Sequence, residues 1–406
     1  MKIFGFFIKR LFLKRWILSL SMLLLLFAAN YLTFTVARSI SSTYQGYQEM
    51  RRMDQDGTYI ANLDPDSAPN FDRITLEKTQ AVYDYLSDNY TYALYADGFI
   101  ISLPNDDDIE ISLNYISRES YALNQLDLSA GSELYFDYQL NEDEIPVLIG
   151  KGLSNAYPVG STIKISDPVL ERPIILKVQG VIKPNAHHSN FYALNSKNYY
   201  NFSIFIPVNE EFIKESNIDL HVNALMDMVV LHTTEEDAAT LSEYIQNNLG
   251  LKFNFFSQEE NYDYFKDYYA NSLKIIMIIT LFLLVIIICL SIWNASTSIR
   301  LMLKDFTINL LIGLSFSRLK KILFGYFSIL FSVNLIVIAV ITAYNRHLFW
   351  VNKDTLFVTY GLFGLIGIDW VGLLVVACSD VLIGIVIIEI MLWKIKNIPI
   401  SLGVLQ

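Results

Sequence analysis

Two short clusters in the first half of the chain contain the residue types that bind metals or transfer protons. The run Asp106–Asp108 with Glu110 supplies carboxylates, but it lacks the glycine and the distal glutamate of a calcium loop. His187 and His188 are adjacent, and no cysteine or regularly spaced acid lies near them in sequence to complete a zinc site. We therefore interpret the acidic run as a solvated turn and the histidines as part of a polar loop, and we predict no metal site.

The common catalytic motifs are absent from the sequence. There is no Gly-x-x-x-x-Gly-Lys-(Ser/Thr) phosphate loop, no Gly-x-Ser-x-Gly and no His-Glu-x-x-His. The two cysteines, Cys289 and Cys378, both lie in apolar runs, so the polar part of the chain has no disulfide. We predict no catalytic residues and no cofactor in this chain, so work driven by ATP would require a separate ATPase.

A basic stretch near the C-terminus, residues 300–321, lies between two long apolar runs. Excess Lys and Arg in a short loop beside a membrane span marks the cytoplasmic side. Helical periodicity in its first half allows a basic amphipathic helix that receives force from a cytoplasmic partner, and a plain inside loop is the alternative. The candidate coupling residues are Arg300, Lys304, Asp305, Gly313, Ser315, Arg318, Lys320 and Lys321.

The composition indicates a membrane protein. Of 406 residues, 53% are hydrophobic and 17% are charged, which is too apolar for an ordinary soluble chain of this length. Residues 39–272 contain 36 acids and 14 bases and have a net charge near −22, while the remainder has 5 acids and 16 bases and is near +11. No basic stripe outside the membrane-proximal pieces supports nucleic-acid binding. The residue usage suggests a low-GC Gram-positive bacterium.

Four apolar runs are long enough to cross a bilayer as helices. Basic residues at the N-terminus and after the last run place both termini in the cytoplasm and the acidic block outside. The predicted fold is an α-helical bundle of four transmembrane helices, one plus three, with a large extracytoplasmic α+β domain between the first two. The predicted segments are an interfacial amphipathic segment 1–15, first span 16–37, extracytoplasmic stalk and core domain 38–272, second span 273–294, cytoplasmic coupling loop 295–321, third span 322–344, outer loop 345–370, fourth span 371–393 and cytoplasmic tail 394–406.

Three polar residues fall inside the predicted spans, where charge is costly. Asp380 lies midway along the fourth span, and we favour a contact at a helix or dimer interface over a proton relay. Asn334 is a candidate for an interhelical hydrogen bond. Glu389 lies near the inner boundary, within reach of Lys394 or Lys396.

The acidic block has the mixed pattern of an α+β domain. Helical periodicity covers residues 75–87 and 235–249, and a stalk helix is expected to continue outward over residues 38–53. Residues 144–183 read as strand, short helix, glycine turn, strand, turn and strand. Gly160 supplies the turn, and Gly180 marks a bulge or close approach within the last strand.

Two of these stretches resemble the FtsX-like ABC-transporter permeases of the MacB and lipoprotein-releasing type. In that family's cytoplasmic loop an acid precedes by eight positions the glycine of an Ala-Leu-Gly-Ala-Ser turn; here Asp305 precedes Gly313 in Leu-Ile-Gly-Leu-Ser. The acid is Asp rather than Glu, Leu310 replaces the usual arginine, and the acid near the start of the next span is missing. Residues 144–183 resemble the family's extracytoplasmic core domain in the same order of elements.

The resemblance implies a permease subunit without enzymatic activity in the cell membrane. It implies a second permease chain, identical or homologous, and nucleotide-binding subunits that hold ATP and Mg²⁺ and drive the outer domain mechanically. Export of peptides, or resistance to them, is the expected use, with a peptide or an accessory protein as outer partner. Mechanical control of a cell-surface partner, a peptide sensor without transport, and a membrane-tethered enzyme remain alternatives.

Overall fold

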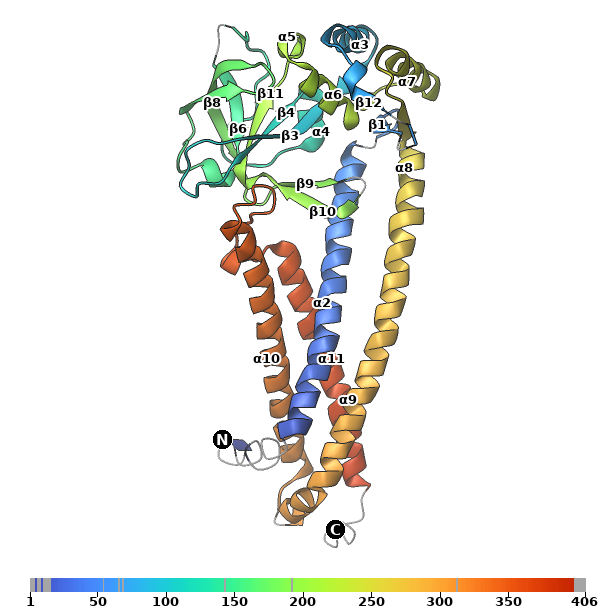
Figure 1. Ribbon diagram of the computed structural model, residues 1–406. Coiled ribbons are helices and arrows are strands. Elements are labelled where there is room, and N and C mark those ends of the chain that lie inside the picture. The colour runs from blue at the N-terminus through green and yellow to red at the C-terminus, as the bar shows by residue number, and fades with distance from the viewer. Residues whose placement is uncertain are drawn as a thin grey trace. The chain divides into compact units, whose positions relative to one another are not determined.

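The computed structural model (Figure 1) divides into two compact units. The helical unit comprises Met1–Ser41, Asn271–Asn345 and Gly367–Gln406, and the α/β unit comprises Ser42–Ala270 and Arg346–Ile366. The predicted interfacial segment 1–15, apart from residues 4, 5 and 9, and the tail from 398 lie outside the described residues. The structure describes residues 4, 5, 9, 16–53, 55–64, 66, 67, 69–141, 144–190, 193–311 and 313–397.

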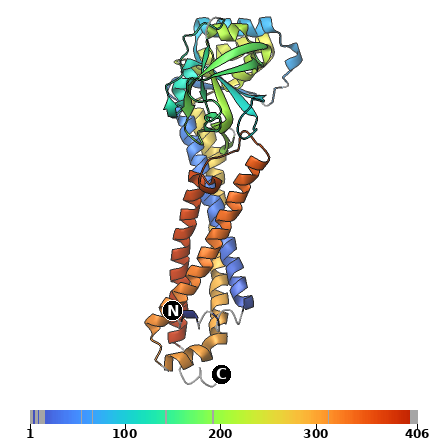
Figure 2. The same ribbon diagram turned by 90° about the vertical axis from the view of Figure 1, so that its left-hand side faces the viewer.

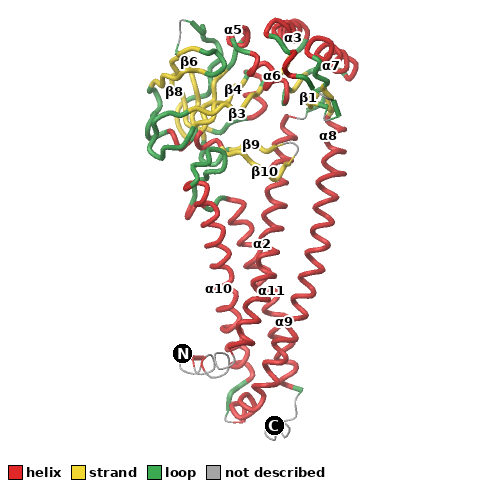
Figure 3. The backbone as a smooth tube through the Cα atoms, viewed as in Figure 1, coloured by secondary structure: helices red, strands yellow, loops and turns green. Residues whose placement is uncertain are grey.

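Among the described residues, four helical stretches are long and apolar enough to cross a membrane. The first is α2, and the predicted continuation of this helix over residues 38–53 is confirmed. Residues 258–270, which lead into α9, are helical as well, through α8 and a π-helical segment, η6 (Figure 3). The bounds are α2 Trp16–Met53, α8 Gln258–Tyr264, η6 Phe265–Ala270, α9 Asn271–Leu311, α10 Phe316–Val351 and α11 Gly367–Lys396.

The helical unit packs through apolar side chains and close glycine contacts. Leu26, Leu323 and Ile387 come from three different helices and are buried in one cluster. A Cβ on Gly372 would lie 2.9 Å from the Phe34 ring, and one on Gly384 would lie 2.9 Å from the Phe331 ring. Small residues at helix contacts allow the close approach that stabilises helices in a membrane, where apolar burial alone contributes little.

The α/β unit is built on a seven-stranded mixed sheet (Figures 1 and 2). Its strand order is β3-β4-β11-β6-β8-β5, with β7 paired to β8. The β4–β11 and β6–β8 pairs are parallel, and the others are antiparallel. The bounds are β3 Tyr95–Ile101, β4 Ile111–Ile116, β5 Leu128–Gly131, β6 Ile145–Ile149, β7 Thr162–Asp167, β8 Arg172–Ile182 and β11 Ser203–Pro207.

A second, four-stranded antiparallel sheet has the order β13-β1-β12-β2, and a separate hairpin is formed by β9 and β10. The helix predicted at 235–249 is confirmed as α7, and that predicted at 75–87 as α3, with Thr75 at its N-cap position. The strands are β1 Tyr59–Leu63, β2 Thr91–Ala93, β9 His187–Asn190, β10 Ala193–Tyr199, β12 Val229–Leu231 and β13 Phe253–Ser257. The helices are η3 Phe71–Arg73, α3 Leu76–Asn89, α4 Arg118–Asn124, η4 Lys151–Leu153, η5 Tyr200–Phe202, α5 Glu210–Glu215, α6 Ile218–Met226 and α7 Glu235–Leu249.

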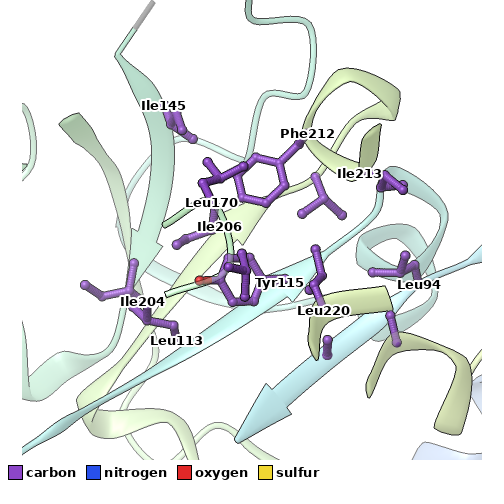
Figure 4. Packing of buried hydrophobic residues seen from close by; sticks show 14 of the residues in the cluster. Leu94, Leu113, Tyr115, Ile145, Leu170, Ile204, Ile206, Phe212, Ile213 and Leu220 are labelled. Atoms are coloured by element: carbon purple, nitrogen blue, oxygen red, sulfur yellow. The ribbon is translucent and has the colours of Figure 1, made fainter. Parts of the chain in front are cut away.

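A large apolar cluster in the α/β unit lies between the sheet and its covering helices (Figure 4), and smaller clusters accompany it. Tyr115 from β4, Ile204 from β11 and Phe212 from α5 are all fully buried in it. The Tyr115 hydroxyl donates a hydrogen bond to Asp167 Oδ2 at 2.9 Å, so the one polar group of that side chain is satisfied.

Residues 144–183 have the predicted order of strand, short helix, turn, strand, turn and strand, formed by β6, η4, β7 and β8. Gly160 has a φ of +89°, a value that side chains with a Cβ rarely adopt. At Gly180 the register between β6 and β8 shifts, and a Cβ there would lie 2.8 Å from the Ser132 carbonyl oxygen. Both glycines therefore occupy positions that a larger residue would strain.

The segment between α10 and α11 belongs to the α/β unit, which the sequence did not predict. Residues 345–370 are predicted from the sequence as an outer loop. Residues 367–370 belong to α11 instead, and Val358 is fully buried in the core of the α/β unit. This segment also includes the short helix η7, Leu362–Gly364.

Hydrogen bonds to three backbone carbonyls hold this segment in place. The Tyr199 N–H donates to the Leu356 carbonyl at 2.7 Å, and Asn201 Nδ2 donates to the Val358 carbonyl at 2.9 Å. Asn185 Nδ2 donates to the Tyr360 carbonyl at 2.6 Å. Periodicity did not reveal this segment because its pairing partners are more than 150 residues away in sequence.

Candidate functional site

The turn between α9 and α10 lies in the stretch that the sequence marks as the coupling loop. Gly313 has a φ of +105°, which favours glycine because a Cβ is strained there. Ser315 follows, and its Oγ accepts a hydrogen bond from the Arg318 N–H at 3.3 Å, as an N-cap residue does. The turn therefore ends one apolar helix and begins the next within four residues.

The basic residues of this stretch differ in their surroundings. Arg300, Arg318 and Lys321 have exposed side chains. Lys320 forms an ion pair with Glu389 of α11 instead. Lys304 and Asp305 lie within α9, and their side chains are outside the described part of the chain.

The structure also corrects the expected partner of Glu389. Sequence proximity suggested Lys394 or Lys396, one to two turns along the same helix. Lys320 on the neighbouring α10 forms the pair, because helix packing brings it close to Glu389. Lys394 Nζ donates to Ser296 Oγ at 2.7 Å, and Lys396 lies over the Phe316 ring.

Polar side chains connect α2 to each of the other long helices. Asn30 Nδ2 donates to Asp380 Oδ2 of α11 at 3.0 Å, and both side chains are buried. Asn334 Nδ2 of α10 donates to the Leu23 carbonyl at 3.4 Å. Asn294 Nδ2 of α9 donates to Ser21 Oγ at 2.7 Å. These bonds favour one arrangement of the four helices, because an unpaired polar group in an apolar environment is costly.

An ion pair joins α2 to the beginning of α11. Arg38 Nε lies 2.7 Å from Asp369 Oδ1, and the Asp369 side chain is completely buried. Asp369 is in the first turn of α11, where the helix dipole also favours a negative charge. Removing Arg38 would take away an ion-pair partner of a buried carboxylate, which is more costly than losing an exposed pair.

Within the α/β unit, the C-terminal part of α2 packs against the β9–β10 hairpin. A Cβ on Gly46 would lie 2.3 Å from the Leu194 carbonyl oxygen, so this helix position requires glycine. Ser42 Oγ donates to the Asn195 carbonyl at 3.0 Å. The helix and the hairpin are therefore in backbone contact.

A half-buried charged cluster extends this contact by one turn of α2. Glu49 Oε1 lies 2.8 Å from His187 Nε2 and 3.6 Å from Lys197 Nζ, and Glu49 Oε2 accepts from the Ser189 N–H at 2.8 Å. Burial opposes ionisation of Glu49, but His187, Lys197 and Ser189 together outweigh it and lower the pKa of Glu49 to about 2. Burial lowers the pKa of Lys197.

The two clusters with metal-ligating residue types, the acidic run and the histidine pair, have structural roles. Asp106–Asp108 forms a turn, and Asp108 pairs with Lys353. The prediction of a polar loop for His187 and His188 is wrong, because both lie half-buried on strand β9. His188 packs against the Tyr95 ring at 5.3 Å between centroids. Strand pairing with β10 turned a hydrophilic sequence into a buried contact.

Sequence reasoning did not identify Glu49, Lys197 or Asn30. Asn30 was detectable, since it is an amide within the first apolar run. Glu49 and Lys197 are ordinary charged residues in polar stretches, and only the tertiary structure shows that they face each other. The coupling loop, the helix polar contacts and the Glu49 cluster occupy separate places along the chain.

No protein-family model matches the chain, and no curated protein matches it. Among solved structures, the chain is similar to the periplasmic region of MacB from Actinobacillus actinomycetemcomitans, with 13% identity and a TM-score of 0.32 over 53% of this chain and 95% of that one. It is also similar to the extracellular domain of the noncanonic ABC-type transporter YknZ from Gram-positive bacteria, with 15% identity and a TM-score of 0.32 over 49% of this chain and 100% of that one.

Proposed function

We propose that the chain is the permease subunit of an FtsX/MacB-like ABC transporter. The observation that supports this most directly is the pair of exposed basic side chains, Arg318 and Lys321, in the first two turns of α10, the helix that follows the turn at Gly313. Exposed basic side chains at the start of a helix form a suitable docking surface for a cytoplasmic partner. The spacing of Asp305 and Gly313 is that of the family's coupling loop.

In this proposal the chain crosses the membrane once before the α/β unit and three times after it. Residues 300–321, which include the α9–α10 turn, and the end of α11 are rich in Lys and Arg and face the cytoplasm, as do both termini. The acidic α/β unit lies outside a bacterial plasma membrane. The stalks are the C-terminal part of α2 and the segment formed by α8 and η6.

The proposed mechanism is mechanical. A partner ATPase binds ATP and Mg²⁺, changes shape and pushes the α9–α10 turn. Because α2 is a single helix of 38 residues, about 57 Å at 1.5 Å per residue, a shift of its inner part is transmitted along its length. Gly46 and Glu49 then pass that shift to the β9–β10 hairpin.

The proposed assembly contains a second permease chain, identical or homologous, and two nucleotide-binding subunits. Four helices in one chain leave little room for a pore that passes a large solute, so cargo would be handled at the outer face. We propose peptides as that cargo, in export or in resistance. An accessory protein outside the membrane is a further possible partner.

Other functions make different predictions. A regulator of a cell-surface partner would keep the ATPase but move no peptide, and a peptide sensor would have no ATPase partner. A membrane-tethered enzyme would show activity in the α/β unit alone. Capture of an ATPase therefore separates the permease and the regulator from the peptide sensor and the enzyme.

The test is a pull-down of the tagged chain from native membranes in mild detergent, followed by mass spectrometry and an ATPase assay. We expect a nucleotide-binding subunit with the wild-type chain and at least tenfold less of it with Arg318→Glu and Lys321→Glu combined. Lys164→Glu, an exposed reversal on β7, is the matched control and should leave capture unchanged. Capture of no ATPase by the wild type would refute the permease function, and full capture by the double variant would refute the docking surface.

A further inference from the structure

A cavity of about 630 Å³ opens within the α/β unit where both stalks enter it. The second sheet supplies Ile60 from β1 and Phe256 from β13. The last residue of α6, Met226, closes one side. Met50 of α2 and Tyr264 of α8 complete the wall, so each stalk contributes a side chain. This volume is in the range of pockets that enclose drug-sized ligands.

The charged groups of the cavity are all acidic. Among the described residues that line it there is no lysine, arginine or histidine, while Asp64, Asp66 and Asp227 are present. Asp64 is already paired, because Lys252 Nζ donates to its Oδ2 at 2.7 Å. Asp66 is exposed at the rim. Asp227 is the acid that remains at the apolar wall.

Asp227 is half-buried, and the charged groups that act on it are His188 and Asp97. Burial lowers the pKa of His188, so its ring loses its proton at a lower pH than the ring of an exposed histidine does. Burial raises the pKa of Asp227, and Asp97 adds to that effect. A cation placed in the cavity would offset this desolvation, whereas a neutral or anionic group would not.

We propose that this cavity binds an apolar ligand carrying a single cationic group, with the cation at Asp227 and the apolar body against Met50, Ile60 and Phe256. The inference rests on the proposed function and deepens it, because it names the chemical class of the compound handled outside the membrane. Charge complementarity supports this occupant, since the described lining residues combine apolar side chains with carboxylates and include no cation.

The position of the cavity gives the ligand a mechanical consequence. Met50 lies one residue after Glu49 in α2, and Tyr264 is the last residue of α8. A ligand that fills the space contacts both stalks at once. Ligand binding in the cavity and the separation of the two stalks are therefore coupled, and the coupling free energy is the same in both directions.

The test uses the full-length chain in detergent and the probe dansyl-leucyl-arginine amide, with dansyl fluorescence and isothermal titration as readouts. The matched probe, dansyl-leucyl-citrulline amide, has nearly the same shape without the charge. We expect the arginine probe to bind at least tenfold more tightly than the citrulline probe. Asp227→Asn should abolish that difference, while Asp219→Asn, an exposed acid on α6 away from the cavity, should keep it.

A filling variant keeps the test decisive if Asp227→Asn disturbs folding. Asn254→Trp places a large ring in the cavity and should remove binding of both probes above the detergent background. Equal binding of the two probes by the wild type, or unchanged arginine-probe binding in both variants, would overturn the proposal. If the arginine probe is not preferred but the ATPase is still captured, the cavity assignment is wrong and the permease function stands. If the arginine probe is preferred but no ATPase is captured, the cavity is a ligand site in a protein that is not a permease.

Discussion

Replacing Glu49 by Gln tests the idea that a charged cluster fixes α2 to the β9–β10 hairpin. Gln has nearly the same shape and can still accept the Ser189 N–H, so the change removes charge rather than volume. Glu49 is 19% exposed and lies against His187 and Lys197, both partly or wholly buried. We expect the variant to be less stable than the wild type, since Lys197 would remain buried without its counter-ion.

The pKa of Glu49 gives the size of the effect. Its ordinary value is 4.5 and its value in the folded chain is about 2. At 1.36 kcal/mol per pKa unit, this difference corresponds to about 3 kcal/mol of stability. Because the folded pKa is the lower one, the contribution is complete above about pH 4.5 and is lost as the pH falls toward about 2.

The assay is thermal unfolding of the purified full-length chain, followed by tryptophan fluorescence from pH 3 to pH 7. A loss of about 3 kcal/mol in a domain of this size lowers Tm by about 6–12 °C. Glu144→Gln is the matched control, because its pair with Lys177 is 2.9 Å long but each side chain is 45% exposed. An exposed pair contributes about 0–1 kcal/mol, so the control should shift Tm by at most about 4 °C.

Two results would refute this reasoning. If Glu49→Gln and Glu144→Gln have the same Tm at pH 7, the cluster adds no more than a surface pair. If the difference between wild type and Glu49→Gln does not shrink as the pH falls below about 4.5, the carboxylate of Glu49 is not its source.

Two further substitutions test contacts within the α/β unit. Gly46→Val places methyl groups against the Leu194 carbonyl, so it should separate α2 from the β9–β10 hairpin and speed trypsin cleavage there. The control is Gly367→Ala, which has no atom within 4 Å of the added Cβ and should behave as wild type. Asn201→Ala removes the hydrogen bond to the Val358 carbonyl and leaves a buried acceptor unpaired, so it should lower the stability of the fold by about 1–3 kcal/mol. Hydrogen exchange of the amides in residues 356–360 should become faster. Unchanged exchange there would contradict the docking of this segment.

The elements with strong local periodicity could be predicted from the sequence. The α7 bounds match the predicted range, and the order of strands and turns in residues 144–183 is the predicted one. Apolar runs of about 20 residues define the long helices, and they depend on composition alone. Gly160 and Gly313 were recognisable because glycine at a turn reports backbone conformation directly.

Contacts between distant segments could not be predicted in this way. The partner of Glu389 was misjudged because the nearest lysines in sequence are on the same helix, whereas Lys320 reaches it across a helix contact. The histidine pair was misread because burial comes from β10 and α2, which have no local signal in that stretch. The docking of residues 346–366 onto the α/β unit is of the same kind.

The sequence by itself determined the four apolar helices, the mixed fold of the acidic block and the basic turn, since each depends on the composition or period of one continuous stretch. Tertiary structure alone decided that Glu49 meets His187 and Lys197, that Asn30 meets Asp380, and that Asp227 borders an apolar cavity. The physical reason is that burial and pairing set the energy of a charged group. Both depend on residues that are far apart in the chain.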